Sequence, residues 1–136
     1  MELSVIPLFL CAKADRLPAR QREHTERGER MNLKLMEENG VLVAAVAGEI
    51  DHHSAVLLRE KVDRQIAARR PRKLCIDLSG VSFMDSSGLG FIMGRYRNMA
   101  GLGGEVSVKG AQGRIEAVLQ MSGAYRYVRK AEEENT

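Results

Sequence analysis

The feature that most constrains the fold of this chain is an apolar run at residues 41–47, VLVAAVA, which has no polar side chain on either face. Successive side chains of a β-strand point to opposite faces, so a strand of this composition must be covered on both sides. Such strands lie in the interior of α/β sheets. A second apolar-rich run at residues 32–36 precedes it, and Asn39-Gly40 between the two runs predicts an antiparallel hairpin.

The chain then alternates between helical and strand-like periodicity. Ala55, Leu58, Val62 and Ile66 repeat at helical spacing, and Pro71 ends this helix. The other expected segments are strands at 73–78 and 105–109, helices from 86 and over 115–119, and connectors at 48–53 and 80–84. This order predicts an α/β fold: one domain with a mostly parallel mixed sheet, an opening hairpin and helices packed on the sheet.

Residues 1–30 differ in character from the rest of the chain. Residues 13–30 are polar and of mixed charge, without a helical stripe, which is typical of disorder. The apolar run before them has no preceding basic residue and is too short to span a bilayer. We therefore expect residues 1–30 to be a disordered or artefactual leader, with Met31 as the true start. Residues 31–136 would form the domain, with an acidic tail from Ala131.

Charge and cysteine content argue against several classes of protein. The chain has 21 basic and 18 acidic residues, a formal net charge of +3, which gives no strong field for nucleic acid or anionic lipid. Cys11 and Cys75 lie far apart without CxxC spacing, as expected for free thiols in a reducing cytosol. The adjacent His52 and His53 point in different directions and make no metal-ligand pattern. We expect a cytoplasmic protein that binds no metal, membrane or nucleic acid.

The segment Asp85-Ser86-Ser87-Gly88 has the composition of a helix start, where Asp85 can accept amide hydrogens of the first turn. It follows a predicted strand, and functional crevices of α/β sheets lie beyond the carboxyl ends of strands. A phosphate on Ser86 would meet the positive end of the helix and add roughly −1.5 to −2 charges to a contact surface. Gly88 and Gly90 would let another backbone approach closely. Judged from these residues alone, ordinary helix capping is the favoured explanation, and the spacing does not by itself establish a phosphorylation site.

Five blocks of sequence carry a resemblance to a known family. They are Gly48-Glu-Ile-Asp-His-His-Ser-Ala55, Val81-Ser-Phe-Met-Asp-Ser-Ser-Gly-Leu-Gly90, Gly94-Arg-Tyr96, Gly103-Gly-Glu105 and Met121-Ser-Gly123. In this order and spacing they resemble the anti-sigma factor antagonists of the STAS domain family, in particular those of the sporulation type. The resemblance runs from about residue 31 to the early 130s. The chain departs from the family in its leader and in the basic stretch RRPR at 69–72, and neither touches the motif.

The resemblance implies a regulatory cycle and no enzyme activity. The unphosphorylated antagonist binds an anti-sigma factor that is also a serine kinase, here the anti-sigma F factor, and so releases sigma F for early sporulation transcription. The kinase phosphorylates the serine directly after the aspartate of the motif, and a serine phosphatase of the sporulation type reverses this. ATP belongs to the kinase, so the chain needs no cofactor. The implied site comprises the phosphorylated Ser86 and the partner-binding residues Glu49, Asp51, His52, Asp85, Ser87, Gly88 and Leu89.

Other interpretations of the same residues remain open. An antagonist for a stress-response sigma factor would share the site and the mechanism, and a ligand-sensing STAS module would lack the phosphorylation. An enzyme with Ser86 as nucleophile would need a G-x-S-x-G elbow, but Met84 occupies the first glycine position. A dinucleotide site at Gly88 and Gly90 would need a third glycine where Met93 stands.

Overall fold

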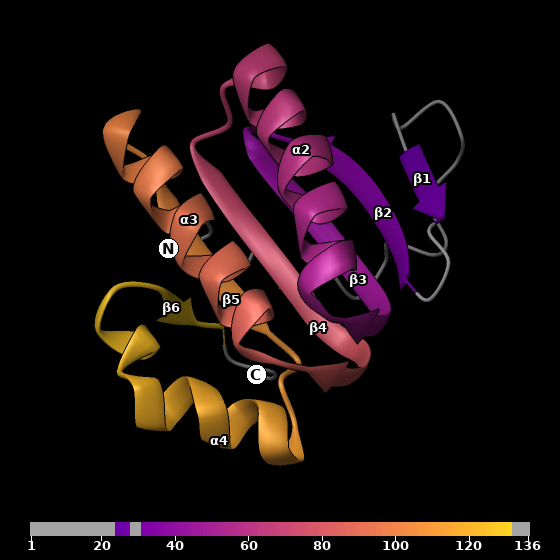
Figure 1. Cartoon of the computed structure of the whole chain (residues 1–136). Helices are drawn as coiled ribbons and strands as arrows, with labels where there is room; N and C mark the ends of the chain where they lie inside the picture. Colours follow the sequence, from indigo (N-terminus) through magenta and orange to yellow (C-terminus); the bar gives the residue numbers. More distant parts are fainter. Residues whose placement is uncertain (1–23, 28–30, 132–136) are drawn as a thin grey trace.

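The computed structural model describes residues 24–27 and 31–131, and within them six strands form one sheet accompanied by three α-helices (Figure 1). The strands are β1 (His24–Arg27), β2 (Met31–Glu38), β3 (Val41–Ile50), β4 (Lys73–Met84), β5 (Glu105–Lys109) and β6 (Arg129–Lys130). The helices are α2 (His52–Arg69), α3 (Ser86–Gly101), α4 (Gly113–Ser122) and the short 3-10 helix η3 (Ala124–Arg126).

The sheet is mixed, with strand order β1-β2-β3-β4-β5-β6. β1 and β2 pair antiparallel, as do β2 and β3, whereas the remaining neighbours pair in parallel. Asn39 and Gly40 form the β2–β3 turn with φ of 57° and 81°, the positive values that a tight hairpin turn requires. The predicted α/β class, mixed sheet and opening hairpin are confirmed.

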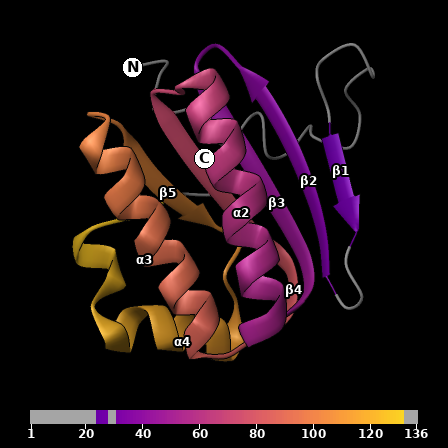
Figure 2. The same cartoon turned by 45° about the horizontal axis from the view of Figure 1, so that its top comes forward.

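α2 and α3 lie side by side on one face of the sheet (Figures 1 and 2). Leu42, Leu74 and Val106 form a row across β3, β4 and β5. They belong to one buried cluster with Leu58 of α2 and Ile92 of α3. The apolar positions that the helical and strand periodicities selected therefore meet in this core.

A charged contact between the buried Arg95 and the partly exposed Asp63 ties α3 to α2. The Nε of Arg95 lies 2.9 Å from Asp63 Oδ1, and Asn98 Nδ2 donates a hydrogen bond of 2.8 Å to the same oxygen. Burial lowers the pKa of Arg95, and the neighbouring Asp63 carboxylate opposes that shift. The two helices are thus linked through polar side chains as well as through the core.

β4 is longer than the sequence predicts. The pattern indicates a strand at 73–78 and a connector at 80–84, but β4 continues to Met84 and pairs with β3 as far as Ile50. The backbone of β3 offers hydrogen-bonding partners along this whole length, and two register shifts accommodate the extra residues. The side-chain pattern of residues 79–84 does not show that β3 continues beside them, so the extra length of β4 could not be predicted from it.

The connector predicted at 48–53 is shorter for the same reason. β3 runs to Ile50, Asp51 alone joins the two elements, and α2 begins at His52. Gly48, with φ of 96°, lies at one of the two register shifts. The positive φ is accessible to glycine without strain, so β3 can keep pairing where a regular strand would end.

A strand also lies within the predicted leader. His24–Arg27 pair with Asn32 to Leu35 of β2, because the outer edge of β2 presents backbone groups that any extended segment can satisfy. The sequence predicts disorder for these four residues, whereas in the structure they form a strand. The rest of the leader and the tail beyond Ala131 lie outside the described residues, and the expectation of a dispensable leader stays a prediction there.

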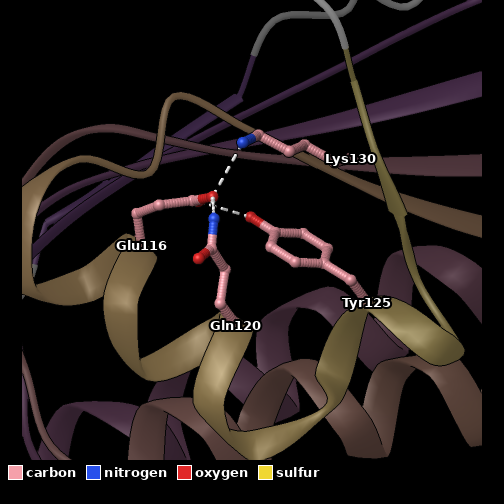
Figure 3. A network of polar contacts seen from close by, with 4 residues as sticks. All are labelled: Glu116, Gln120, Tyr125 and Lys130. Atoms are coloured by element: carbon pink, nitrogen blue, oxygen red, sulfur yellow. Dashed lines mark hydrogen bonds and ion pairs between the residues drawn. The ribbon is translucent and has the colours of Figure 1, made fainter.

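The carboxylate of Glu116 links α4 to η3 and β6 (Figure 3). Its carboxylate accepts hydrogen bonds from the Tyr125 hydroxyl at 2.6 Å, Gln120 Nε2 at 2.7 Å and Lys130 Nζ at 2.7 Å. Burial on its own would raise the pKa of Glu116, but the three donors outweigh it and the pKa is lowered. Burial and the contact with Glu116 raise the pKa of Tyr125, so its hydroxyl stays protonated and continues to donate.

Replacing Glu116 should remove a pH-dependent part of the stability. Because the folded pKa of Glu116 is lowered, its contribution is complete above the unfolded value, about 4.3, and is lost as the pH falls through the folded value. We expect Glu116→Gln to lower the free energy of unfolding by ~1 kcal/mol at pH 7. The gap to wild type should narrow as the pH falls below the unfolded value, as measured by urea unfolding with circular dichroism. A gap that does not change with pH would contradict this role.

Candidate partner-binding site

Two helices begin side by side at the carboxyl edge of the sheet. Asp51 leads from β3 into α2, and Asp85 leads from β4 into α3. The last residues of these parallel strands, Ile50 and Met84, pair with each other, and the Asp85 amide donates to the Ile50 carbonyl at 3.2 Å. The edge therefore presents two neighbouring helix N-termini, each with free amide hydrogens and a partial positive charge.

Asp51 starts α2 with a reciprocal cap. The Ser54 amide donates to Asp51 Oδ1 and the Asp51 amide donates to Ser54 Oγ, each at 2.9 Å. Ser54 Oγ also lies 3.0 Å from the carbonyl of Glu49, to which it can donate. This D-x-x-S capping box occupies the Asp51 carboxylate in the fold, whereas the next residue, His52, is exposed.

Asp85 starts α3 and leaves the following serine free. The Ser87 amide donates to Asp85 Oδ1 at 2.8 Å, and the Gly88 amide donates to the Asp85 carbonyl at 3.0 Å. Ser86 lies between them at the first helical position and is exposed, and its hydroxyl makes no hydrogen bond within residues 24–27 and 31–131. A hydroxyl in this position is sterically and chemically able to accept a phosphoryl group.

Removing the α3 cap should destabilise the domain measurably. We expect Asp85→Ala to lower the free energy of unfolding by about 0.5–2 kcal/mol, because the Ser87 amide loses its acceptor. Asp85→Asn is the matched control, since asparagine caps a helix about as well as aspartate. Urea unfolding followed by circular dichroism measures both variants. Equal losses in the alanine and asparagine variants would show that the cap is not the cause.

Gly88 and Gly90 have different roles in the structure. A Cβ at Gly88 would lie 2.1 Å from Met84 Cγ and 3.2 Å from Ile50 Cγ2, whereas a Cβ at Gly90 would have no atom within 4 Å. Gly88 is buried, so its missing side chain lets α3 begin directly over the ends of β3 and β4. The close approach expected at Gly88 is thus made by this chain's own Met84. Of these two glycines, only Gly90 leaves open space on the helix surface.

Phe83 lies at the same edge of the sheet, and the sequence did not single it out. It pairs with Glu49 across β4 and β3, two residues before Asp85, and its side chain is 48% exposed. Aromatic side chains are enriched at protein interfaces. The sequence predicts a connector at 80–84, so it gave no reason to expect an aromatic side chain held at the end of a strand. Leu89, by contrast, is half-buried and packs against the core.

Most of the residues expected at the site lie on one edge of the sheet. Gly88 lies beneath it, and the members that reach the surface in whole or in part are Glu49, Asp51, His52, Asp85, Ser86, Ser87 and Leu89. Within the described part of the chain, no group of three or more His, Cys, Asp or Glu is arranged to hold a metal ion. No helix described there is long and apolar enough to cross a bilayer.

Comparison with known proteins identifies the family. The STAS domain profile matches residues 32–135. The anti-sigma F factor antagonist of Paenibacillus polymyxa is 38% identical over 98 residues, which cover 71% of this chain and 84% of that protein. This chain belongs to the STAS family of anti-sigma factor antagonists. The anti-sigma-B factor antagonist of Bacillus subtilis is 29% identical to this antagonist over 93 residues, 68% of this chain and 84% of that protein.

Solved structures of the family share the fold of this antagonist. SpoIIAA in its unphosphorylated form superposes with a TM-score of 0.66 at 28% identity, covering 74% of this chain and 89% of that one. SpoIIAA in its phosphorylated form gives a TM-score of 0.61 at 28% identity, covering 74% and 92%. The resemblance and the fold inferred from the sequence are confirmed. The family match begins after β1, so that strand lies outside the shared domain.

Proposed function

We propose that this antagonist, in its unphosphorylated form, binds the anti-sigma F factor and thereby releases sigma F for early sporulation transcription. The observation that carries the proposal is the exposed Ser86 hydroxyl at the first position of α3. It follows the capping aspartate in a chain whose relative is an anti-sigma F factor antagonist. Ser86 is the residue that the kinase activity of the anti-sigma factor would modify.

The proposed modification is a phosphoryl transfer from ATP held by the partner. The Ser86 oxygen forms a bond to the γ-phosphorus, the bond from that phosphorus to the bridging oxygen of ADP breaks, and the hydroxyl proton passes to a base of the kinase. This chain contributes the acceptor and its presentation, and needs no cofactor and no catalytic residue of its own. A phosphatase of the sporulation type would hydrolyse the serine phosphate and restore binding.

The proposed switch acts locally on the contact surface. A phosphate on Ser86 would lie at the N-terminus of α3, where negative charge is favourable for the helix. It would also add about −1.5 to −2 charges beside Phe83, whose exposed ring suits an apolar contact. We therefore expect phosphorylation to release the partner without unfolding the domain.

The docking surface in this proposal surrounds Ser86 at the carboxyl edge of the sheet. It comprises the expected residues Glu49, Asp51, His52, Asp85, Ser87, Gly88 and Leu89, with Phe83 added. Gly88 would act by supporting α3 from beneath, and Asp51 and Asp85 by holding the two helix starts. Because ATP-dependent control of transcription takes place in the cytoplasm, we propose that the protein acts there, without direct contact with nucleic acid or membrane.

The nearest alternative is an antagonist for a stress-response sigma factor, as the similarity to the anti-sigma-B factor antagonist suggests. The higher identity to the anti-sigma F factor antagonist, 38% against 29%, favours the sporulation pathway. Affinity purification with the tagged chain from its source organism tests the choice. Recovery of a sporulation kinase and sigma F supports the proposal, and recovery of a stress-response pair replaces it.

The other alternative is a ligand-sensing STAS module that is never phosphorylated. Incubation of the pure chain with the recovered kinase and ATP separates the two functions. The proposal predicts a mass increase of one phosphate, which Ser86→Ala abolishes. An unmodified wild-type chain, in the presence of a kinase that modifies another substrate, would favour the ligand-sensing module.

A further inference from the structure

Arg95 lies on the buried side of α3, where the neighbouring positions are apolar. Its exposed fraction is 5%, and Phe91, Ile92 and Met99, one turn before and one turn after it, belong to the buried core. A guanidinium keeps its charge in proteins and is almost never fully buried unless it is paired. A charged side chain at this position therefore needs an explanation beyond the packing of α3 on the sheet.

The contacts of the Arg95 guanidinium are few and incomplete. Its Nε lies 2.9 Å from Asp63 Oδ1 of α2, and its Cζ lies 5.4 Å from the centre of the Phe91 ring. Within the described residues, neither Nε nor Nη1 donates a hydrogen bond of good geometry. The Asp63 side chain is 37% exposed, and the same oxygen accepts a hydrogen bond from Asn98. Arg95 is thus held by one ionic contact and one cation–π contact.

A contact of this kind stabilises a fold poorly. Removing a guanidinium from water costs free energy, which an ionic contact regains only when the remaining N–H groups are also bonded. Replacing such a pair with apolar side chains of similar volume often leaves stability unchanged or raises it. What the pair adds is direction, because apolar contacts are non-directional, whereas the Arg95 side chain must face Asp63. The best-attested use of such polar contacts is to fix the register of two helices.

We propose that Arg95 is a positioning residue, which fixes α3 relative to α2 through Asp63. The two helices begin side by side at the carboxyl edge of the sheet, and the Asp51 cap holds the start of α2. Ser86 begins the helix that carries Arg95 and lies about 14 Å from it along the axis, at a rise of about 1.5 Å per residue. A rotation of α3 that is prevented at Arg95 is therefore prevented at Ser86 as well. The contact presents Ser86 and the start of α2 in one fixed arrangement.

The functional consequence rests on the proposed phosphorylation of Ser86, whereas the structural part does not. In the proposed reaction the Ser86 oxygen must lie in line with the γ-phosphorus of the ATP that the kinase holds. A displacement of about 1 Å, caused by a change far from the reacting atoms, can slow such a reaction ~100-fold. Loss of the contact between Arg95 and Asp63 should therefore slow phosphoryl transfer without a matching loss of stability.

A double variant of the full chain, Arg95→Met with Asp63→Leu, replaces the charged contact with apolar side chains. We expect its midpoint of urea unfolding to equal or exceed that of the wild type. Its kcat as a substrate of the anti-sigma factor kinase should fall at least tenfold. Arg97→Met is the matched control, because Arg97 is exposed on the same helix, and it should keep the wild-type kcat. Partial unfolding alone would lower the concentration of folded substrate, which raises the apparent KM and leaves kcat unchanged.

Asp63→Asn is a milder second variant, which decides if the double variant does not fold. It keeps an oxygen that can accept from Asn98 and removes the charge that faces Arg95, so kcat should fall by a smaller factor. The amide signals of residues 86–88 in a nitrogen–proton correlation spectrum test the positioning without the kinase, and should move in both variants but not in Arg97→Met.

Two results would overturn the role of Arg95. One is a folded variant without the charged contact that keeps the wild-type kcat, and the other is a set of amide signals at residues 86–88 that does not move. A wild-type chain that the kinase leaves unmodified would instead refute the proposed function, and the amide signals would still decide whether Arg95 positions α3.

Discussion

Ser86→Asp weakens binding to the anti-sigma factor by about tenfold or more, equivalent to at least ~1.4 kcal/mol, while the thermal midpoint of the free protein changes little. Ser86 is exposed and its hydroxyl has no partner in the described residues, so the fold loses no contact. An acid at a helix N-terminus is favourable by about 0.3–1 kcal/mol. The same charge in an interface built against a neutral hydroxyl costs free energy on binding.

Titration calorimetry with the anti-sigma factor and a circular dichroism melt measure the two effects separately. Ser86→Ala should bind as wild type does and resist the kinase. Ser87→Ala is the matched control for the switch, because the Asp85 cap uses the backbone amide of Ser87 and not its hydroxyl. Whatever the Ser87 hydroxyl contributes to the docking surface, this variant should still accept phosphate on Ser86 and lose affinity when it does. If Ser86→Asp unfolded the protein or bound as tightly as wild type, the local switch would be wrong.

Gly88→Ala lowers the free energy of unfolding by about 1–3 kcal/mol, the usual cost of an overpacked core position. The new Cβ would lie 2.1 Å from Met84 Cγ, a mid-chain atom that is itself buried and cannot simply rotate away. α3 must shift from the ends of β3 and β4, and with it the N-terminal turn that presents Ser86. We therefore expect slower phosphorylation of this variant as well as lower stability.

Gly90→Ala is the matched control for Gly88→Ala. It lies in the same helix, with no atom within 4 Å of the added Cβ, so the higher helix propensity of alanine should raise stability by roughly 0.5–1 kcal/mol. Urea unfolding of both variants gives the comparison. Similar losses at the two positions would mean that helix propensity, and not contact with Met84, controls the start of α3.

The sequence predicts those parts of the fold that depend on local pattern. The Asn39-Gly40 turn, the helix face of Ala55 and Leu58, and the strand at 105–109 need only their own residues, and β5 has those bounds in the structure. The start of α3 after Asp85 was also predictable, because a capping aspartate before two serines and a glycine is itself a local signal.

Features that depend on a neighbouring backbone could not be predicted in the same way. β1 forms because β2 has a free edge, and the last part of β4 forms because β3 continues beside it with two register shifts. The exposure of Phe83 and the contact of Gly88 with Met84 follow from that longer β4. The residues of the candidate site were therefore recognisable, whereas the division of roles between Gly88 and Gly90 was not.

The central claim is that one exposed serine controls the association of this antagonist with its partner. A phosphopeptide map of the chain after reaction with the purified anti-sigma factor kinase and ATP, combined with the affinity of the phosphorylated product, tests it most directly. We predict phosphate on Ser86 and none on Ser87, with at least tenfold weaker binding of the product. Phosphate on any other residue, or a phosphorylated Ser86 that leaves the affinity unchanged, would contradict the claim.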